Sequence, residues 1–282
     1  MLLTDVNEFN WSVDNFGSTF TDTALGTSVT SGTSNTKGTA VSLISGASVT
    51  EDCYELTVQF VGGAVSSATR TFLADILIDE SGGSTWTTKI SNLLVCSTHL
   101  YLGGYRYVFP IYVKAGTSIG VQIQCNTSSI AIRCGVKLRG KPTYPQLMKV
   151  GYRVETFGAN TGTTLGTELT GGASQDKGDY VSLGTTTNDN WYWQIGTSVA
   201  DAIAGASFAY FFDLAAGDVT NKKMCMENSM FQRDNSERSG RPDAFGDYIP
   251  IKKIKAGEDV YARVAFTLAA DSMINATAYG VS

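Results

Sequence analysis

Nucleophilic catalysis by serine or cysteine needs a neighbouring general base, and the one histidine in the chain is His99. It follows Cys96 and Ser97 in the segment 96–104, whose glycines and short polar residues are typical of a loop. These two candidate nucleophiles stand so close together that the sequence assigns the role to neither. We interpret His99 as a surface loop residue.

The cysteines stand at wide, irregular spacing without a Cys-x-x-Cys pair, so we interpret them as free thiols, mostly buried. Cys125 and Cys134 fall on the inward faces of two alternating segments joined by residues 126–129, which predicts a hairpin. The register of that hairpin sets Cys125 opposite Ile130 and Cys134 opposite Val121, so no disulfide is expected. The five cysteines are Cys53, Cys96, Cys125, Cys134 and Cys225.

Glycoside hydrolysis needs two carboxyl groups facing each other across a cleft, about 5 to 10 Å apart. Asp75 could form such a pair with Asp79 or Glu80. Asp213 lies in a similar apolar segment later in the chain. Because the same acid recurs in the same setting, we expect a structural hydrogen-bonding role for Asp75 and Asp213, and we expect no enzymatic activity.

The segment 232–247 is the most polar stretch of the second half, and its acids are the one candidate for a Ca²⁺ site, since hard cations prefer clustered oxygens. Its arginines would compete for the same carboxylates, so an ion-paired solvent loop or a contact with a neighbouring subunit is the favoured alternative. The acids are Asp234, Glu237, Asp243 and Asp247, and the arginines are Arg233, Arg238 and Arg241.

Trp191 and Trp193 lie two residues apart, which would place both indoles on one face of a strand. Sugar-binding sandwiches use such aromatic platforms, so these two residues are the candidate glycan site. Packing in a core or an interface is the favoured alternative for two tryptophans.

The elements that position these residues occur twice. Residues 24–43 and 164–183 are identical at eleven of twenty positions, at an offset of 140 residues. The segment 109–116 is repeated, with one insertion, at 249–257. We therefore predict an internal duplication: a short N-terminal segment over 1–12, a first unit over 13–148 and a second over 149–282.

Each unit is predicted to be an antiparallel β-sandwich of the jelly-roll type, so the fold class is all-β. Apolar and polar residues alternate with a period of two, as in Tyr54–Phe60 and Ile130–Leu138. Glycine, serine and threonine clusters separate the runs. Eight strands are expected in the first unit, at 20–30, 38–46, 53–61, 69–79, 86–96, 104–113, 117–125 and 129–138.

Composition excludes several classes of function. The net charge is −5, which is the wrong sign for binding nucleic acid phosphates. No apolar run is long enough to cross a bilayer, and Met1–Asp5 lacks the basic and apolar regions of a signal peptide, so we expect no membrane insertion. One histidine cannot build a histidine-rich zinc site, and no nucleotide or metalloprotease motif occurs, so we expect no cofactor.

The segments Phe72–Asp79, Ile90–Cys96, Gly103–Tyr105 and Phe109–Val121 together resemble virion structural proteins of tailed bacteriophages. The resemblance covers mainly residues 70–138, and in the second unit it is preserved around 249–264. It implies a structural role in a virus particle, assembly in many copies in the host cytoplasm, and location in the virion.

The favoured function is therefore a non-enzymatic virion protein associated with the tail or baseplate. Its expected partners are other virion proteins and copies of itself. Two alternatives remain open: a capsid decoration (cement) protein, and a carbohydrate-binding adhesin that contacts a host surface glycan.

Overall fold

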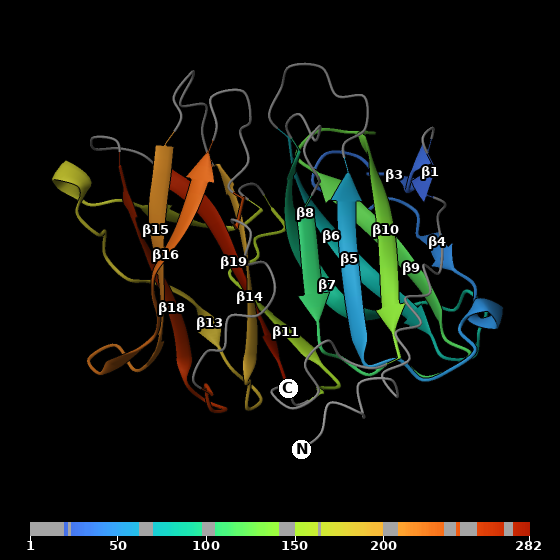
Figure 1. The fold of residues 1–282 in the computed structure, drawn as a ribbon. Helices are drawn as coiled ribbons and strands as arrows, with labels where there is room; N and C mark the ends of the chain where they lie inside the picture. Colours follow the sequence, from blue (N-terminus) through green and yellow to red (C-terminus); the bar gives the residue numbers. More distant parts are fainter. Residues whose placement is uncertain are drawn as a thin grey trace, which may run out of the picture.

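The fold is all-β and built from antiparallel sheets, as the alternating sequence pattern predicts (Figure 1). No α-helix occurs among the residues that the computed structural model describes. Within that same set, no helix has the length and apolar character needed to cross a bilayer. The described residues are 20–21, 24–61, 70–97, 105–140, 150–162, 165–199, 208–233, 241–242, 253–267 and 273–282.

The first half forms a sandwich of two four-stranded sheets, in the orders β3-β10-β5-β8 and β4-β9-β6-β7. A short pair, β1 and β2, lies outside these sheets. The strands are β1 (Phe20–Thr21), β2 (Ala24–Leu25), β3 (Thr27–Thr30), β4 (Val41–Ile44), β5 (Glu55–Val61), β6 (Arg70–Asp79), β7 (Thr87–Ser97), β8 (Tyr105–Phe109), β9 (Ser118–Cys125) and β10 (Ala131–Arg139).

Alternating side chains from both sheets fill the first core. Leu56, Val58 and Phe60 of β5 point inward and are fully buried. Strand β6 is apolar on both faces, since Phe72 packs in this core while Leu73 packs on the other side with Leu94 and Leu165. A strand covered on both faces reads as a continuous apolar run, which explains the segment 72–78.

The second half contains a sheet in the order β13-β18-β15-β16-β17 and a second sheet in which β19 pairs with β11, β12 and β14. Trp193, Phe212 and Val264 lie in the core between them. The strands are β11 (Val154–Phe157), β12 (Thr167–Thr170), β13 (Val181–Thr185), β14 (Tyr192–Val199), β15 (Phe208–Gly217), β16 (Lys222–Arg233), β17 (Arg241–Pro242), β18 (Asp259–Phe266) and β19 (Met273–Val281).

The prediction of a hairpin at residues 126–129 is wrong. Strand β9 pairs with β4 and β6, whereas β10 pairs with β3 and β5, so this connection crosses from one sheet to the other. Both sheets bury their inward side chains in the same core, and local alternation does not distinguish this crossing from a hairpin. Cys125 and Cys134 are both buried and form no disulfide, and burial raises the pKa of the Cys134 thiol.

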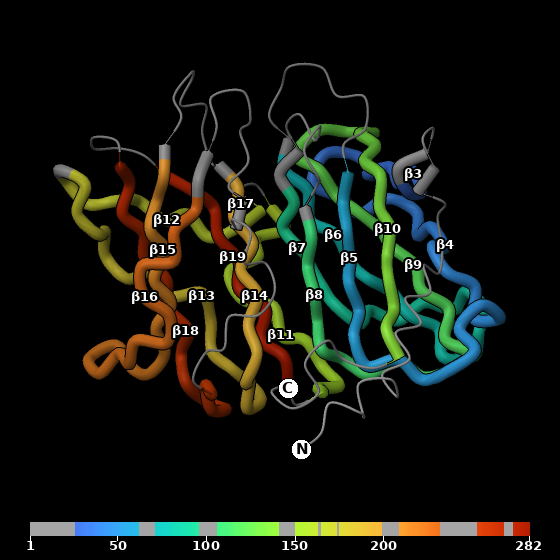
Figure 2. The backbone as a smooth tube through the Cα atoms, viewed as in Figure 1, coloured from blue at the N-terminus to red at the C-terminus, as the bar shows by residue number. Residues whose placement is uncertain are grey.

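The two sandwiches lie side by side, with β7 and β8 of the first half facing β11, β14 and β19 of the second (Figures 1 and 2). Tyr192, Tyr279 and Val281 of the second half belong to the first core. The outer face of the sheet containing β14 and β19 thereby closes one side of the first sandwich. The expected N-terminal segment 1–12 and the expected boundary near residue 148 lie outside the described residues.

Candidate functional site

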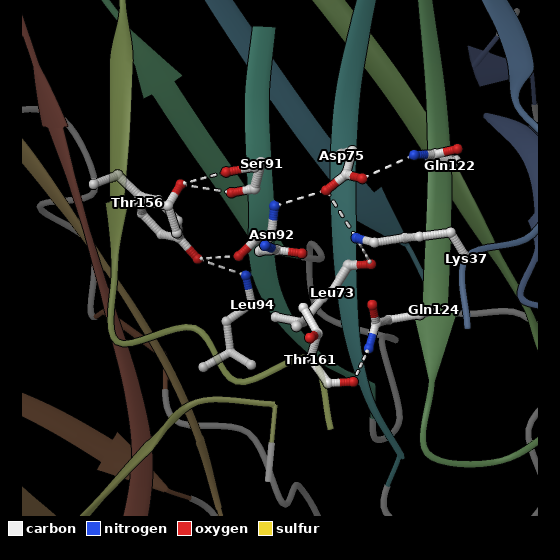
Figure 3. A network of polar contacts seen from close by, with 11 residues as sticks. Lys37, Leu73, Asp75, Ser91, Asn92, Leu94, Gln122, Gln124, Thr156 and Thr161 are labelled. Carbon is white, nitrogen blue, oxygen red and sulfur yellow. Dashed lines mark hydrogen bonds and ion pairs between the residues drawn. The ribbon is translucent and has the colours of Figure 1, made fainter. Parts of the chain in front are cut away.

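Asp75, on β6, is the centre of a polar network between strands (Figure 3). Its Oδ1 accepts hydrogen bonds from Lys37 Nζ at 2.8 Å and from the backbone N–H of Asn92 at 2.8 Å. Its Oδ2 accepts a hydrogen bond from Gln122 Nε2 at 2.9 Å. Lys37 Nζ also donates to the carbonyl of Leu73 at 3.0 Å. Both carboxylate oxygens of Asp75 therefore have partners.

Asp213, on β15, is the centre of a matching network and is fully buried. Its Oδ2 is 2.7 Å from Lys177 Nζ and 2.8 Å from Arg263 Nε, and its Oδ1 accepts the backbone N–H of Asn228 at 2.8 Å. Lys177 and Arg263 occupy the places that Lys37 and Gln122 hold around Asp75. The second network thus carries one more cation than the first.

A β-bulge places each acid. The pairing of β6 with β7 shifts register between Ala74 and Ile76, and that of β15 with β16 shifts between Phe212 and Leu214. Opposite these points, Asn92 and Asn228 have φ values of 55° and 53°, a conformation that asparagine tolerates better than most residues. Each bulge frees a backbone N–H, and the buried carboxylate binds it.

Burial and neighbouring charges shift the pKa values of Lys37 and Asp213 in these networks. Burial is the largest influence on the pKa of Lys37 and lowers it, although Asp75 acts in the opposite direction. Burial alone would raise the pKa of Asp213, but the Asn228 N–H, Lys177 and Arg263 together outweigh it and lower that pKa. A general acid needs a raised pKa, so Asp213 is suited to holding strands together and not to proton donation.

Asp79, one proposed partner of Asp75 in an acid pair, has contacts separate from the network around Asp75. Asp79 accepts hydrogen bonds from the backbone N–H groups of Ser81 and Thr85, at 2.9 and 2.8 Å, in the turn after β6. The Ser81 hydroxyl and these N–H groups lower the pKa of Asp79. Glu80 is exposed in the same turn. The structural role expected for Asp75 and Asp213 agrees with their contacts.

Trp193 does not form a glycan platform, because it is completely buried in the second core, with its ring centroid 5.4 Å from that of Phe157. Trp191 is half-buried and packs against the first core instead. Strand β14 has a sandwich core on each side, so the side chains of both alternating faces are buried, including polar ones such as Gln194 and Thr197. The core-packing alternative is therefore the one observed, and the prediction of a Trp191–Trp193 platform is wrong.

The other predicted site residues cannot be compared with the structure. His99 and the Ca²⁺ candidates Asp234, Glu237, Asp243 and Asp247 lie outside the described residues, and the side chains of Cys96 and Ser97 are not described. Within the part of the chain that is described, no three histidine, cysteine or acidic side chains group as a metal site would require.

The seam between the two sandwiches carries a buried cluster of polar contacts that sequence reasoning missed. The Tyr279 hydroxyl accepts a hydrogen bond from the backbone N–H of Leu94 at 2.6 Å and donates to the Asn92 carbonyl at 3.0 Å. The Tyr107 hydroxyl donates to the Leu94 carbonyl, and the Tyr192 hydroxyl donates to the Val108 carbonyl at 2.9 Å. The sequence offered one signal for this cluster, namely tyrosine residues at strand positions where the alternating pattern predicts buried side chains.

Further contacts fix the seam along its length. The Thr156 hydroxyl donates to the Ser91 carbonyl at 2.6 Å, and Gln124 Nε2 donates to the Thr161 carbonyl at 3.0 Å. Ile111 forms a parallel bridge with Gly151. At Gly196, an added Cβ would lie 2.6 Å from the Tyr107 hydroxyl and 3.1 Å from Leu94 Cβ, so glycine permits the close approach of β14. The two sandwiches are joined as one block.

No protein-family model and no curated protein matches this chain. Among solved structures, PNGF-II is similar with 10% identity and a TM-score of 0.38, over 90% of this chain and 65% of that one. PNGase F, a glycosylasparaginase from Flavobacterium meningosepticum, is similar with 9% identity and a TM-score of 0.34, over 96% of this chain and 94% of that one.

The tandem CBM22 domains of Xyn10C from Paenibacillus barcinonensis are similar with 12% identity and a TM-score of 0.28, over 90% of this chain and 86% of that one. The similarities to PNGF-II, PNGase F and these domains are too low to support an argument about activity or ligand.

Proposed function

We propose that this chain is a non-enzymatic structural component of the virion of a tailed bacteriophage, associated with the tail or baseplate and present in many copies. The observation that carries the proposal is the buried seam, in which Tyr279 joins Asn92 and Leu94 across the two sandwiches. Buried hydrogen bonds between rigid sheets resist relative movement. A rigid block of this kind suits a part that is built into a larger assembly.

The chemistry of the buried acids supports the same proposal. Asp75 and Asp213 are each held by a cation and a backbone N–H, which stabilises the bulges of β6 and β15. Such groups contribute to the fold without needing access to a substrate. The resemblance of residues 70–138 to virion proteins supports the location in a particle.

We further propose that the two halves descend from one jelly-roll unit by duplication. The order β3-β10-β5 in the first half corresponds to β12-β19-β14 in the second, and β4-β9-β6-β7 corresponds to β13-β18-β15-β16. Gly38 and Gly178 support this correspondence, since an added Cβ would lie 2.0 Å from the Thr30 carbonyl oxygen and 1.9 Å from that of Thr170.

Immunogold labelling of intact particles, with antibody against this chain and negative-stain electron microscopy, tests the proposed function. Label on the tail or its tip supports a tail component. Label spread over the capsid supports the decoration alternative and overturns the tail assignment. Particles without label overturn the virion proposal.

The adhesin alternative has a separate test, because its glycan would have to bind somewhere other than Trp193. A glycan array probed with the purified chain measures it directly. A specific signal that survives Trp191→Ala supports an adhesin site elsewhere on the surface, and the absence of any signal overturns the adhesin reading.

A further inference from the structure

The core of the first sandwich includes side chains from the second. Tyr192, Tyr279 and Val281 belong to the first core and are almost completely buried. The reverse is not seen among the described residues, because every buried member of the second core lies between Phe157 and Ala278 in the second half. The contribution across the seam therefore runs in one direction.

Tyr279 closes the side of the first sandwich where β7 and β8 end the two sheets. Its ring centroid is 5.4 Å from that of Tyr107 and 6.2 Å from that of Phe109, two buried residues of β8. Its hydroxyl binds the Asn92 carbonyl and the Leu94 N–H of β7. Both strands at this side of the first sandwich therefore depend on β19 to cover apolar rings and to satisfy backbone groups.

Strand β19 is itself held in place by the second sandwich. It pairs with β11, β12 and β14 along its length. Ile274, Ala276 and Ala278 face the second core, whereas Tyr279 and Val281 face the first. The side chains that complete the first core thus stay in position while the second sandwich is folded, and they are withdrawn when it unfolds.

The matching face of the first half is charged. In the duplication proposed above, the pairing of β3 with β10 corresponds to that of β12 with β19, which sets Lys137 at the position of Tyr279 and Arg139 at that of Val281. Arg139 forms an ion pair with Glu55 at 3.2 Å. Charged groups are costly to bury in an apolar core. This face is therefore unsuited to completing the core of another sandwich.

We propose that the two sandwiches unfold in a fixed order: the first opens while the second stays folded, and the second does not open while the first stays folded. The seam stabilises each half by the same free energy, because coupling between two units is reciprocal. The order comes from what each half keeps without the seam. The second keeps all the described members of its core, whereas the first loses Tyr192, Tyr279 and Val281.

This order goes beyond the proposed function and does not depend on it, but it decides which contacts in an assembly stabilise the whole chain. A partner stabilises every state in which its binding surface is folded. A neighbour that binds the first sandwich opposes the opening of both halves. A neighbour that binds the second sandwich opposes the opening of the second half alone.

Hydrogen exchange of the full chain, measured by mass spectrometry where reclosing is faster than exchange, tests the proposal. The slowest amides of β9 and β18 report on the first and second halves. Ile123→Val in the first core and Ile274→Val in the second are matched changes at fully buried residues. Each removes one methyl group and is expected to change the opening equilibrium by about 2- to 10-fold. Val219→Ala, at a residue 71% exposed, is the control.

Ile123→Val is expected to speed exchange in both halves by the same factor, because its site is unfolded in both open states. Ile274→Val is expected to speed exchange in the second half alone, because its site stays folded when the first half opens. Val219→Ala is expected to change neither rate.

Three results overturn the inference. Independent sandwiches would confine the effect of each variant to its own half. A single cooperative block would spread the effects of both variants over the whole chain. The opposite order would confine the effect of Ile123→Val to the first half and spread that of Ile274→Val over both.

Discussion

The Tyr279 hydroxyl accepts a hydrogen bond from the Leu94 N–H at 2.6 Å, although the two residues are 185 positions apart. The same hydroxyl binds the Asn92 carbonyl and lies 2.6 Å from the Thr277 hydroxyl. Burial raises the pKa of Tyr279, so the phenol stays protonated. One side chain of the last strand thus satisfies the backbone of a bulge in the other sandwich.

Tyr279→Phe is expected to lower the free energy of unfolding by about 1–3 kcal/mol, because it leaves buried backbone groups without a partner while keeping the ring. Urea denaturation measures the change. Tyr180→Phe is the control, since the Tyr180 hydroxyl contacts the Met224 sulfur at 3.6 Å in an exposed setting. Equal stability of the Tyr279→Phe and parent chains would contradict a role for the hydroxyl in the seam.

Asp213→Asn is expected to lower the free energy of unfolding by about 3–5 kcal/mol, because it leaves Lys177 and Arg263 without their buried counter-charge. Asp75→Asn is expected to lower the free energy of unfolding by less, since Lys37 is the one cation that the described residues place on Asp75, and Asp75 is slightly exposed. Denaturant unfolding of both variants checks the order. Asp176→Asn, at an exposed position, is the control, and a reversed order would exclude the second cation as the cause.

The contribution of Asp213 is expected to depend on pH. Its pKa in the folded chain is below the ordinary value, so the unfolded chain takes up the proton first as the pH falls. The stabilisation is present above the ordinary carboxyl pKa of about 4 and is lost as the pH falls through the folded pKa. Unfolding free energies of the parent and Asp213→Asn chains should therefore converge at acidic pH. A difference that stays constant down to acidic pH would refute this assignment.

Trp193→Ala is expected to lower the free energy of unfolding by about 3–5 kcal/mol, because it removes a fully buried ring and leaves a cavity beside Phe157. Trp191→Ala is expected to cost less, because Trp191 is half-buried. Thermal and urea unfolding compare the two. If the Trp193→Ala chain were as stable as the parent, the ring would lie at the surface, and the prediction of a glycan platform would stand again.

Local patterning was enough to predict most strands. The expected runs 53–61, 69–79, 117–125 and 129–138 correspond to β5, β6, β9 and β10 within two residues at each end. Alternation with a period of two is a property of neighbouring residues, so it can be read without knowing the fold. The structural role of Asp75 and Asp213 was also predictable, because both stand in the same apolar setting.

The tertiary structure decided which strands and side chains meet. Trp191 and Trp193 stand two residues apart in the sequence, but only the packing of a core on each side of β14 buries Trp193 in the second core and sets Trp191, just before the strand, against the first. Likewise, nothing local indicates that β9 and β10 belong to different sheets or that Tyr279 reaches Leu94. These contacts join distant residues, and their choice depends on which surfaces and backbone groups remain unsatisfied once each sandwich has formed.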